Sequence, residues 1–155
     1  MIEVEIESPD WTAALEDAGT LAVQAAEAAL KGAETAGDVV VLLTSDAEVA
    51  VLNEQYRGKP GATNVLSFPS PESARPHLGD IALAYGVTAR EASEQEKPLA
   101  HHLMHLVAHG VLHLVGYDHE SDSEAETMEA LERRVLAGLG APDPYAPRAG
   151  ADHGH

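Results

Sequence analysis

The chain has 155 residues, no cysteine and a formal net charge of −17. This length suits one ordinary domain, and the lack of cysteine excludes disulfides, cysteine-ligated zinc and a cysteine nucleophile. The negative charge argues against nucleic-acid binding by bulk electrostatics, which normally draws on clustered Lys and Arg. The sequence shows neither a secretory signal nor an apolar run of about 18 residues, so we expect a cytoplasmic protein without a membrane span.

Hydrophobic periodicity and turn residues predict the order of the secondary-structure elements. We expect strands at 3–6, 39–43, 65–68 and 79–84. We expect helices at about 11–31, 46–57, 87–95, 98–115 and 122–139. This order favours an α+β fold, in which a small mixed β-sheet of about four strands packs with about five helices.

The composition changes near residue 141, where Pro, Gly, Ala and Asp become frequent. Such a segment buries too little apolar surface to order itself. We therefore expect a single domain over residues 1–140 and a disordered tail over residues 141–155.

Six of the nine histidines lie between residues 101 and 119. Within the predicted helix, histidines recur every fourth residue at positions 101, 105, 109 and 113. Side chains four residues apart lie on one helix face with Cβ atoms about 6 Å apart, so two imidazoles can reach one zinc ion at about 2.0–2.1 Å. Spacing alone does not choose between the pair His105/His109 and the pair His109/His113. We expect His101 and His102 to face solvent or to line the approach to the site.

A third ligand can come from His119, six residues beyond His113. A continuous helix would point His119 away from the histidine face, but Gly116 can end the helix in a left-handed conformation and turn the chain back. Three nitrogen ligands with an open fourth position describe a catalytic zinc site. Histidines four apart are, however, more often core or surface residues than ligands. The zinc-protease pattern H-E-x-x-H places a general base where this chain has Gly110, which weakens the protease interpretation.

Three blocks of the sequence resemble the YbeY family of bacterial rRNA maturation endoribonucleases. Residues 109–119, His-Gly-Val-Leu-His-Leu-Val-Gly-Tyr-Asp-His, are similar to the family signature H-G-x-L-H-L-x-G-Y-D-H. Residues 56–59 and 63–69, Tyr-Arg-Gly-Lys and Thr-Asn-Val-Leu-Ser-Phe-Pro, resemble a second family block, and residues 78–81, Leu-Gly-Asp-Ile, a third. With their flanking helices the blocks cover roughly residues 35–140.

The resemblance implies a zinc-dependent, single-strand-selective endoribonuclease that acts on rRNA, with the ribosome or ribosomal proteins as partners. It implies one Zn²⁺ per chain, held by His109, His113 and His119 on and beyond a zinc-binding helix in the C-terminal half. It also implies a catalytic role for Arg57, since a guanidinium can pair with the charge that develops on phosphodiester oxygens. Two alternatives stay open: a metal-dependent hydrolase of another substrate, and a non-catalytic ribosome-associated zinc module.

Overall fold

A computed structural model describes residues 1–118 and 120–145 of the chain. Its strands are β1 (Ile2–Ile6), β2 (Asp38–Thr44), β3 (Val65–Pro69) and β4 (His77–Ala84). They form one sheet in the order β1-β2-β4-β3, in which β1, β2 and β4 run parallel and β3 pairs antiparallel with β4. The predicted mixed sheet of four strands is confirmed.

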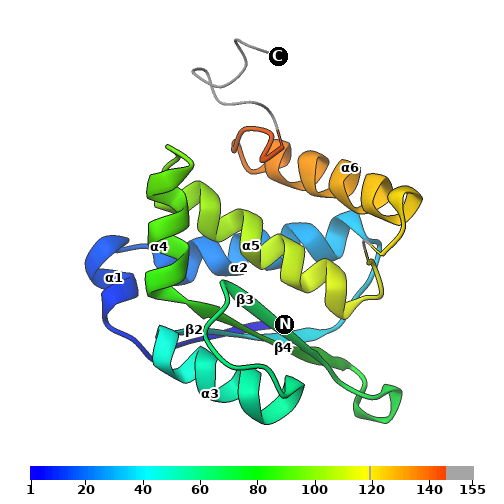
Figure 1. Cartoon of the computed structure of the whole chain (residues 1–155). Helices are drawn as coiled ribbons and strands as arrows, with labels where there is room; N and C mark the ends of the chain where they lie inside the picture. Colours follow the sequence, from blue (N-terminus) through cyan, green and yellow to red (C-terminus); the bar gives the residue numbers. More distant parts are fainter. Residues whose placement is uncertain (119, 146–155) are drawn as a thin grey trace.

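Helices cover both faces of this sheet. In the described residues they are α1 (Asp10–Ala14), α2 (Ala18–Gly32), α3 (Asp46–Arg57), the short 3-10 helix η1 (Glu72–Ala74), α4 (Tyr85–Glu94), α5 (Leu99–Leu114) and α6 (Asp122–Gly138). Helices α2 and α5 lie side by side on one face and α3 lies on the other, while α6 packs against α2 and α5 on the side away from the sheet (Figure 1). The predicted α+β class is confirmed.

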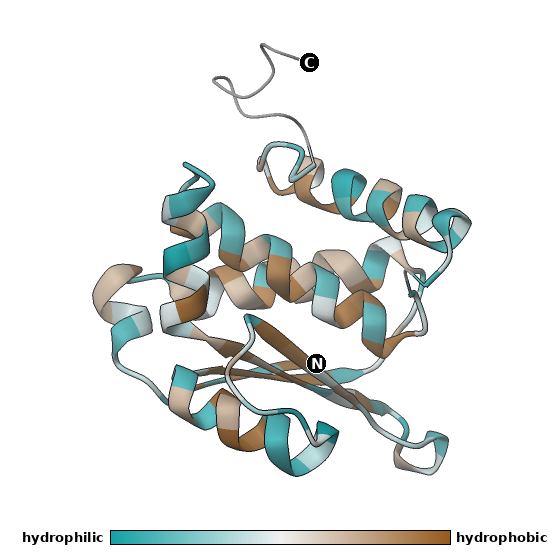
Figure 2. Cartoon of the chain, viewed as in Figure 1, coloured by the Kyte–Doolittle hydropathy of each residue, from teal (hydrophilic) through white to brown (hydrophobic). Residues whose placement is uncertain are grey.

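The alternation of side chains along the strands divides the core into two parts. Val41 and Leu43 of β2 belong to the larger cluster under α2 and α5, whereas Ala82 and Ala84 of β4 belong to a smaller cluster with Val49 of α3. Figure 2 shows the strands and the inward helix faces as hydrophobic, with hydrophilic residues on the outer face of α6. The three-layer arrangement therefore arises because helices bury the apolar side chains on both faces of one sheet.

The single helix predicted over 11–31 is wrong, because the chain is interrupted between α1 and α2. Leu15 adopts an extended conformation that ends α1. Trp11 is fully buried, its indole N–H donates to the Thr44 carbonyl at 3.0 Å, and its ring packs edge-on against Tyr85. One straight helix would have to satisfy both this contact at the end of β2 and the packing of α2 on α5, so the chain changes direction between them.

Helix α5 passes very close to β3 and β4 at Gly110. A Cβ atom at this position would lie 3.1 Å from Cγ2 of Ile81 and 3.3 Å from Oγ of Ser67. The Ser67 hydroxyl also donates to the Gly110 carbonyl at 3.0 Å. Position 110 therefore faces the sheet, and its glycine reflects tight helix–sheet packing.

The described part of the chain continues beyond residue 140, where the sequence suggested that the domain ends. Ala141 is buried in the larger core cluster, and Tyr145 packs against His105 of α5. The remaining residues of the predicted tail, 146–155, lie outside the described residues. Over residues 1–118 and 120–145, no helix combines the length and the apolar character needed to cross a membrane.

Replacing Gly110 with glutamate should destabilise the fold instead of supplying a general base. The new side chain would meet β3 and β4 and bring a charge into a packed interface, so we expect a loss of more than about 3 kcal/mol in the free energy of unfolding. Urea denaturation of the full chain measures this loss.

The control is the replacement of Gly138 with glutamate, because Gly138 is an exposed residue of α6 where an added Cβ would meet nothing within 4 Å. That variant should stay within about 1 kcal/mol of the wild type. Equal stability of the two variants would contradict the packing described for Gly110.

Candidate metal centre

Histidines four residues apart line the side of α5 that faces α6. The ring centroids of His105 and His109 are 6.2 Å apart, and those of His109 and His113 are 4.6 Å apart. The Nε2 atoms of His109 and His113 approach to 3.1 Å. Two nitrogens bound at about 2.0–2.1 Å to one tetrahedral zinc ion would lie roughly 3.3 Å apart. The His109/His113 pair therefore has close to the separation that a shared ion requires.

The fully buried side chain of Glu132, on α6, lies on the opposite side of the His109 ring. Its Oε2 is 3.0 Å from Nδ1 of His109 and its Oε1 is 3.2 Å from Nε2 of His105. The Tyr145 hydroxyl donates to the same carboxylate. Because an ionised carboxylate only accepts hydrogen bonds, both imidazole nitrogens carry a hydrogen in these contacts.

The Glu132 carboxylate is held in its ionised form. Burial alone would raise its pKa, but the hydrogen bonds from His105, His109 and Tyr145 outweigh burial and lower the pKa to about 2. For Tyr145, burial and the hydrogen bond to Glu132 both raise the pKa above its ordinary value, so the phenol stays protonated and donates. The Glu132 carboxylate is therefore surrounded by three hydrogen-bond donors, from His105, His109 and Tyr145.

Two groups of ligands are possible around His109. His105, His109 and Glu132 could hold a metal ion, since one ligand atom from each lies within 4.8 Å of the others. The His109/His113 pair offers its two Nε2 atoms on the other side of the shared ring. Imidazole nitrogen suits zinc, copper, iron and nickel, whereas carboxylate oxygen suits harder ions. Both histidine pairs that the spacing allowed are therefore brought together, through different nitrogens of His109.

The third predicted ligand, His119, lies outside the described residues. The described chain before it does turn at the predicted place, because α5 ends at Leu114 and Gly116 has a φ of 104°. This positive φ is the conformation that glycine adopts readily after a helix. The helix end that the sequence predicted at Gly116 is confirmed, and the ligand role of His119 stays a prediction.

Arg57 is the last residue of α3 and is exposed. Its side chain makes no hydrogen bond or ion pair with any residue that the structure describes. The preceding Tyr56 packs edge-on against Phe68 of β3, with ring centroids 5.4 Å apart. Ser67, the neighbour of Phe68 in β3, donates a hydrogen bond to α5. Strand β3 therefore contacts α3 on one face of the sheet and the histidine helix α5 on the other. The guanidinium is thus free to bind an anion, and its catalytic role stays a prediction.

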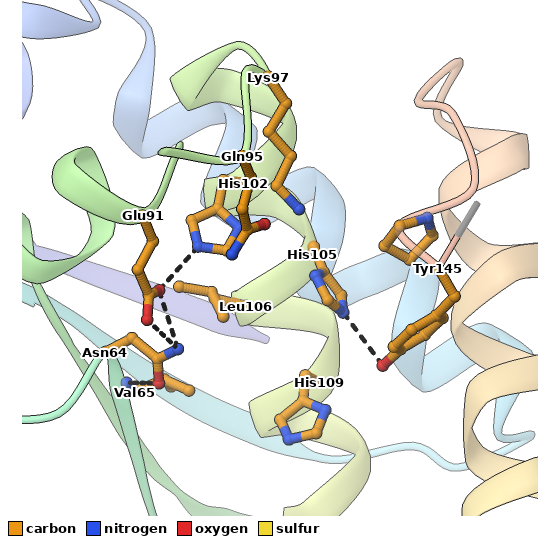
Figure 3. Close-up of a pocket in the computed structure, with 11 residues that line it drawn as sticks. Asn64, Val65, Glu91, Gln95, Lys97, His102, His105, Leu106, His109 and Tyr145 are labelled. Carbon is orange, nitrogen blue, oxygen red and sulfur yellow. Dashed lines mark hydrogen bonds and ion pairs between the residues drawn. The ribbon is translucent and has the colours of Figure 1, made fainter. Parts of the chain in front are cut away.

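A pocket of about 340 Å³ adjoins His109, between α4, α5, the start of β3 and residues 144–145 (Figure 3). Glu91 in its wall accepts a hydrogen bond from the Asn64 amide at 3.0 Å and lies 2.9 Å from Nε2 of His102. His102 is only 3% exposed, and burial lowers its pKa. Burial also lowers the pKa of Lys97, which lines the same pocket. His102 does not face solvent but lines the pocket beside His105 and His109.

Sequence reasoning missed Glu132 and Tyr145 as residues of this site. A signal for Glu132 was present, because it lies on the apolar face of α6 that also carries Met128, Leu131 and Val135. A charged residue in such a face is seldom buried without partners. No comparable signal marked Tyr145, since a lone tyrosine in a Pro- and Gly-rich segment has no periodicity to place it.

Comparison with known proteins identifies a family from the sequence and a solved structure with a similar fold. Residues 3–140 match the protein family described as Endoribonuclease YbeY. The Endoribonuclease YbeY proteins of Rhodopseudomonas palustris (strain BisA53) and Maricaulis maris (strain MCS10) are each 52% identical to this chain, over 97% and 93% of it and 92% and 91% of their own lengths. The solution structure of TM1509 from Thermotoga maritima superposes with a TM-score of 0.57 at 26% identity, over 94% of this chain and 99% of that one. The chain belongs to the Endoribonuclease YbeY family.

Proposed function

We propose that this chain is a zinc-dependent endoribonuclease that cleaves single-stranded RNA in the cytoplasm, in rRNA maturation and ribosome quality control. The observation that carries the proposal is the 3.1 Å approach of two imidazole Nε2 atoms, in a chain whose relatives are named as endoribonucleases. The ribosome or ribosomal proteins are the proposed partners.

The proposed ligands of a single zinc ion are His109, His113 and His119. In support of this set, the Nδ1 atom of His109 faces Glu132 while its Nε2 atom faces His113. Three protein ligands leave a fourth position for water or substrate, as catalytic zinc requires. When bound, zinc lowers the pKa of a coordinated water toward ~7 and polarises a phosphoryl oxygen.

Arg57 is the proposed catalytic residue that binds the phosphodiester. Cleavage places negative charge on non-bridging oxygens, and a guanidinium can pair with two of them at once. The exposed position of Arg57 and its lack of an ion-pair partner among the described residues leave the side chain available for this contact.

RNA binding to a chain of charge −17 must rely on local contacts and not on bulk attraction. The pocket beside His109 offers the Lys97 ammonium, which is part of its lining, for such contacts. A bound divalent ion adds positive charge at the same place. We therefore propose that RNA binds locally near this pocket and that a ribosomal partner assists its delivery.

Replacing His113 with alanine should abolish tight zinc binding, whereas replacing His105 with alanine should leave one zinc ion per chain. The two variants separate the ligand sets, because His113 belongs only to the proposed set and His105 only to the set with Glu132. Metal analysis of the purified chains after dialysis against zinc-free buffer measures the difference. Zinc retained in the His113 variant and lost from the His105 variant would show that the proposed ligand set is wrong.

Replacing Arg57 with alanine should leave the zinc content unchanged and lower cleavage of single-stranded RNA by about 100-fold or more, as loss of a charge-stabilising group does. The matched control is Arg90→Ala, which removes another exposed arginine, from α4. Single-turnover cleavage of a labelled single-stranded RNA, beside a duplex of the same sequence, measures the effect. Unchanged turnover without Arg57 would remove it from the mechanism, and a wild-type chain that binds zinc but cuts neither RNA would favour the alternative functions.

A further inference from the structure

The His109 ring presents its two nitrogens to two different groups. A neutral imidazole has one N–H and one nitrogen with a free lone pair, and the hydrogen bond made by the first decides which nitrogen can bind a metal. Nδ1 lies 3.0 Å from the Glu132 carboxylate and Nε2 lies 3.1 Å from Nε2 of His113. Since the carboxylate can only accept, the hydrogen stays on Nδ1 and the lone pair of Nε2 points to the His113 side.

Glu132 itself is poorly placed to act as a metal ligand. Its side chain is 0% exposed, and both oxygens already accept hydrogen bonds from His105, His109 and Tyr145. A metal bound there would have to displace these donors and remove the hydrogens from both imidazole nitrogens.

Tyr145 fixes the carboxylate from the C-terminal side. Its hydroxyl donates to Glu132, its ring packs edge-on against His105 at 5.5 Å, and Arg133 lies 5.3 Å from the ring centroid. Arg133 also bonds to Asp143 at 3.1 Å, which holds the segment after α6 against the helix. Figure 3 shows the Tyr145 hydroxyl pointing toward His105 beside His109. The segment that follows α6 therefore completes the surroundings of the carboxylate.

We propose that Glu132 is a positioning residue, which with Tyr145 holds His109 in the Nδ1–H tautomer and aims its Nε2 at the metal. The inference rests on the proposed function for the place of the metal, and it adds α6 and residues 141–145 to the metal site. A carboxylate that orients a metal-bound histidine typically changes metal affinity about 10- to 100-fold when it is lost.

The test compares the full-length wild type with Glu132→Gln, Tyr145→Phe and the control Glu126→Gln, which removes an exposed carboxylate from the same helix. Glutamine keeps the shape of Glu132 but can accept at only one of its two terminal atoms. We expect the zinc dissociation constant to rise about 10- to 100-fold in Glu132→Gln, to rise less in Tyr145→Phe, and to stay unchanged in Glu126→Gln. Competition with a chromophoric zinc chelator measures these constants, with zinc alone as the ligand.

A second readout is the tautomer of His109 in the zinc-free chain, observed by long-range ¹H–¹⁵N NMR of the imidazoles. The wild type should show the Nδ1–H form, and Glu132→Gln should show a smaller population of it. Unchanged zinc affinity and an unchanged tautomer in Glu132→Gln would overturn the proposal. Complete loss of zinc binding in that variant, with zinc retained by His113→Ala, would also overturn it, because Glu132 would then be a ligand.

Tyr145→Phe keeps the proposal testable if Glu132→Gln does not fold, since it removes one donor and leaves the buried carboxylate in place. A wild-type affinity and tautomer in Tyr145→Phe would then count against it. Failure of the proposed function is recognised separately: the wild type would bind zinc and show the expected tautomer but would not cleave RNA.

Discussion

The close packing of α5 on the sheet is the constraint on which the site depends. Gly110 lets the helix axis approach β3 and β4, and the Ser67 hydroxyl fixes the helix at that point. With position 110 against the sheet, the 3.6-residue periodicity places the line of residues 105, 109 and 113 about a quarter-turn around the helix from it. His105 and His109 there meet Glu132 of α6. The histidine face is therefore turned toward α6 and its buried Glu132 carboxylate. The same glycine stands where zinc proteases carry their general base, and its contact with the sheet fixes the direction of the histidine face.

The His109 ring links the structural core with the proposed chemistry. On one side it bonds to an ionised carboxylate in the interior, and on the other it faces His113. A buried charge is tolerated only when donors surround it, and His105, His109 and Tyr145 provide them here. Hydrogen bonds to Glu132 link α5, α6 and the segment after α6. The same hydrogen bonds stabilise the contact between these elements and set the direction of the Nε2 lone pair of His109.

Much of the fold could be predicted from the sequence, because period-2 strands and helical spacing report directly which faces are buried. The break between α1 and α2 could not, since it arises from the tertiary contact of Trp11 with the end of β2. For the site, the spacing of the histidines and the turn at Gly116 were readable, but the choice between nitrogens of His109 depends on Glu132, which is 23 residues away in the chain. The position of Tyr145 could not be predicted, because it is set by contacts with Glu132 and His105 that no pattern in its own segment reports.

The central claim is that a metal ion binds on the Nε2 side of His109, beside His113. A crystal structure of the zinc-loaded protein, with the ion located by anomalous scattering at the zinc edge, tests it most directly. We predict one peak at about 2.0–2.1 Å from the Nε2 atoms of His109 and His113, with Glu132 still bonded to Nδ1. A peak between Glu132, His105 and the Nδ1 atom of His109 would contradict the account.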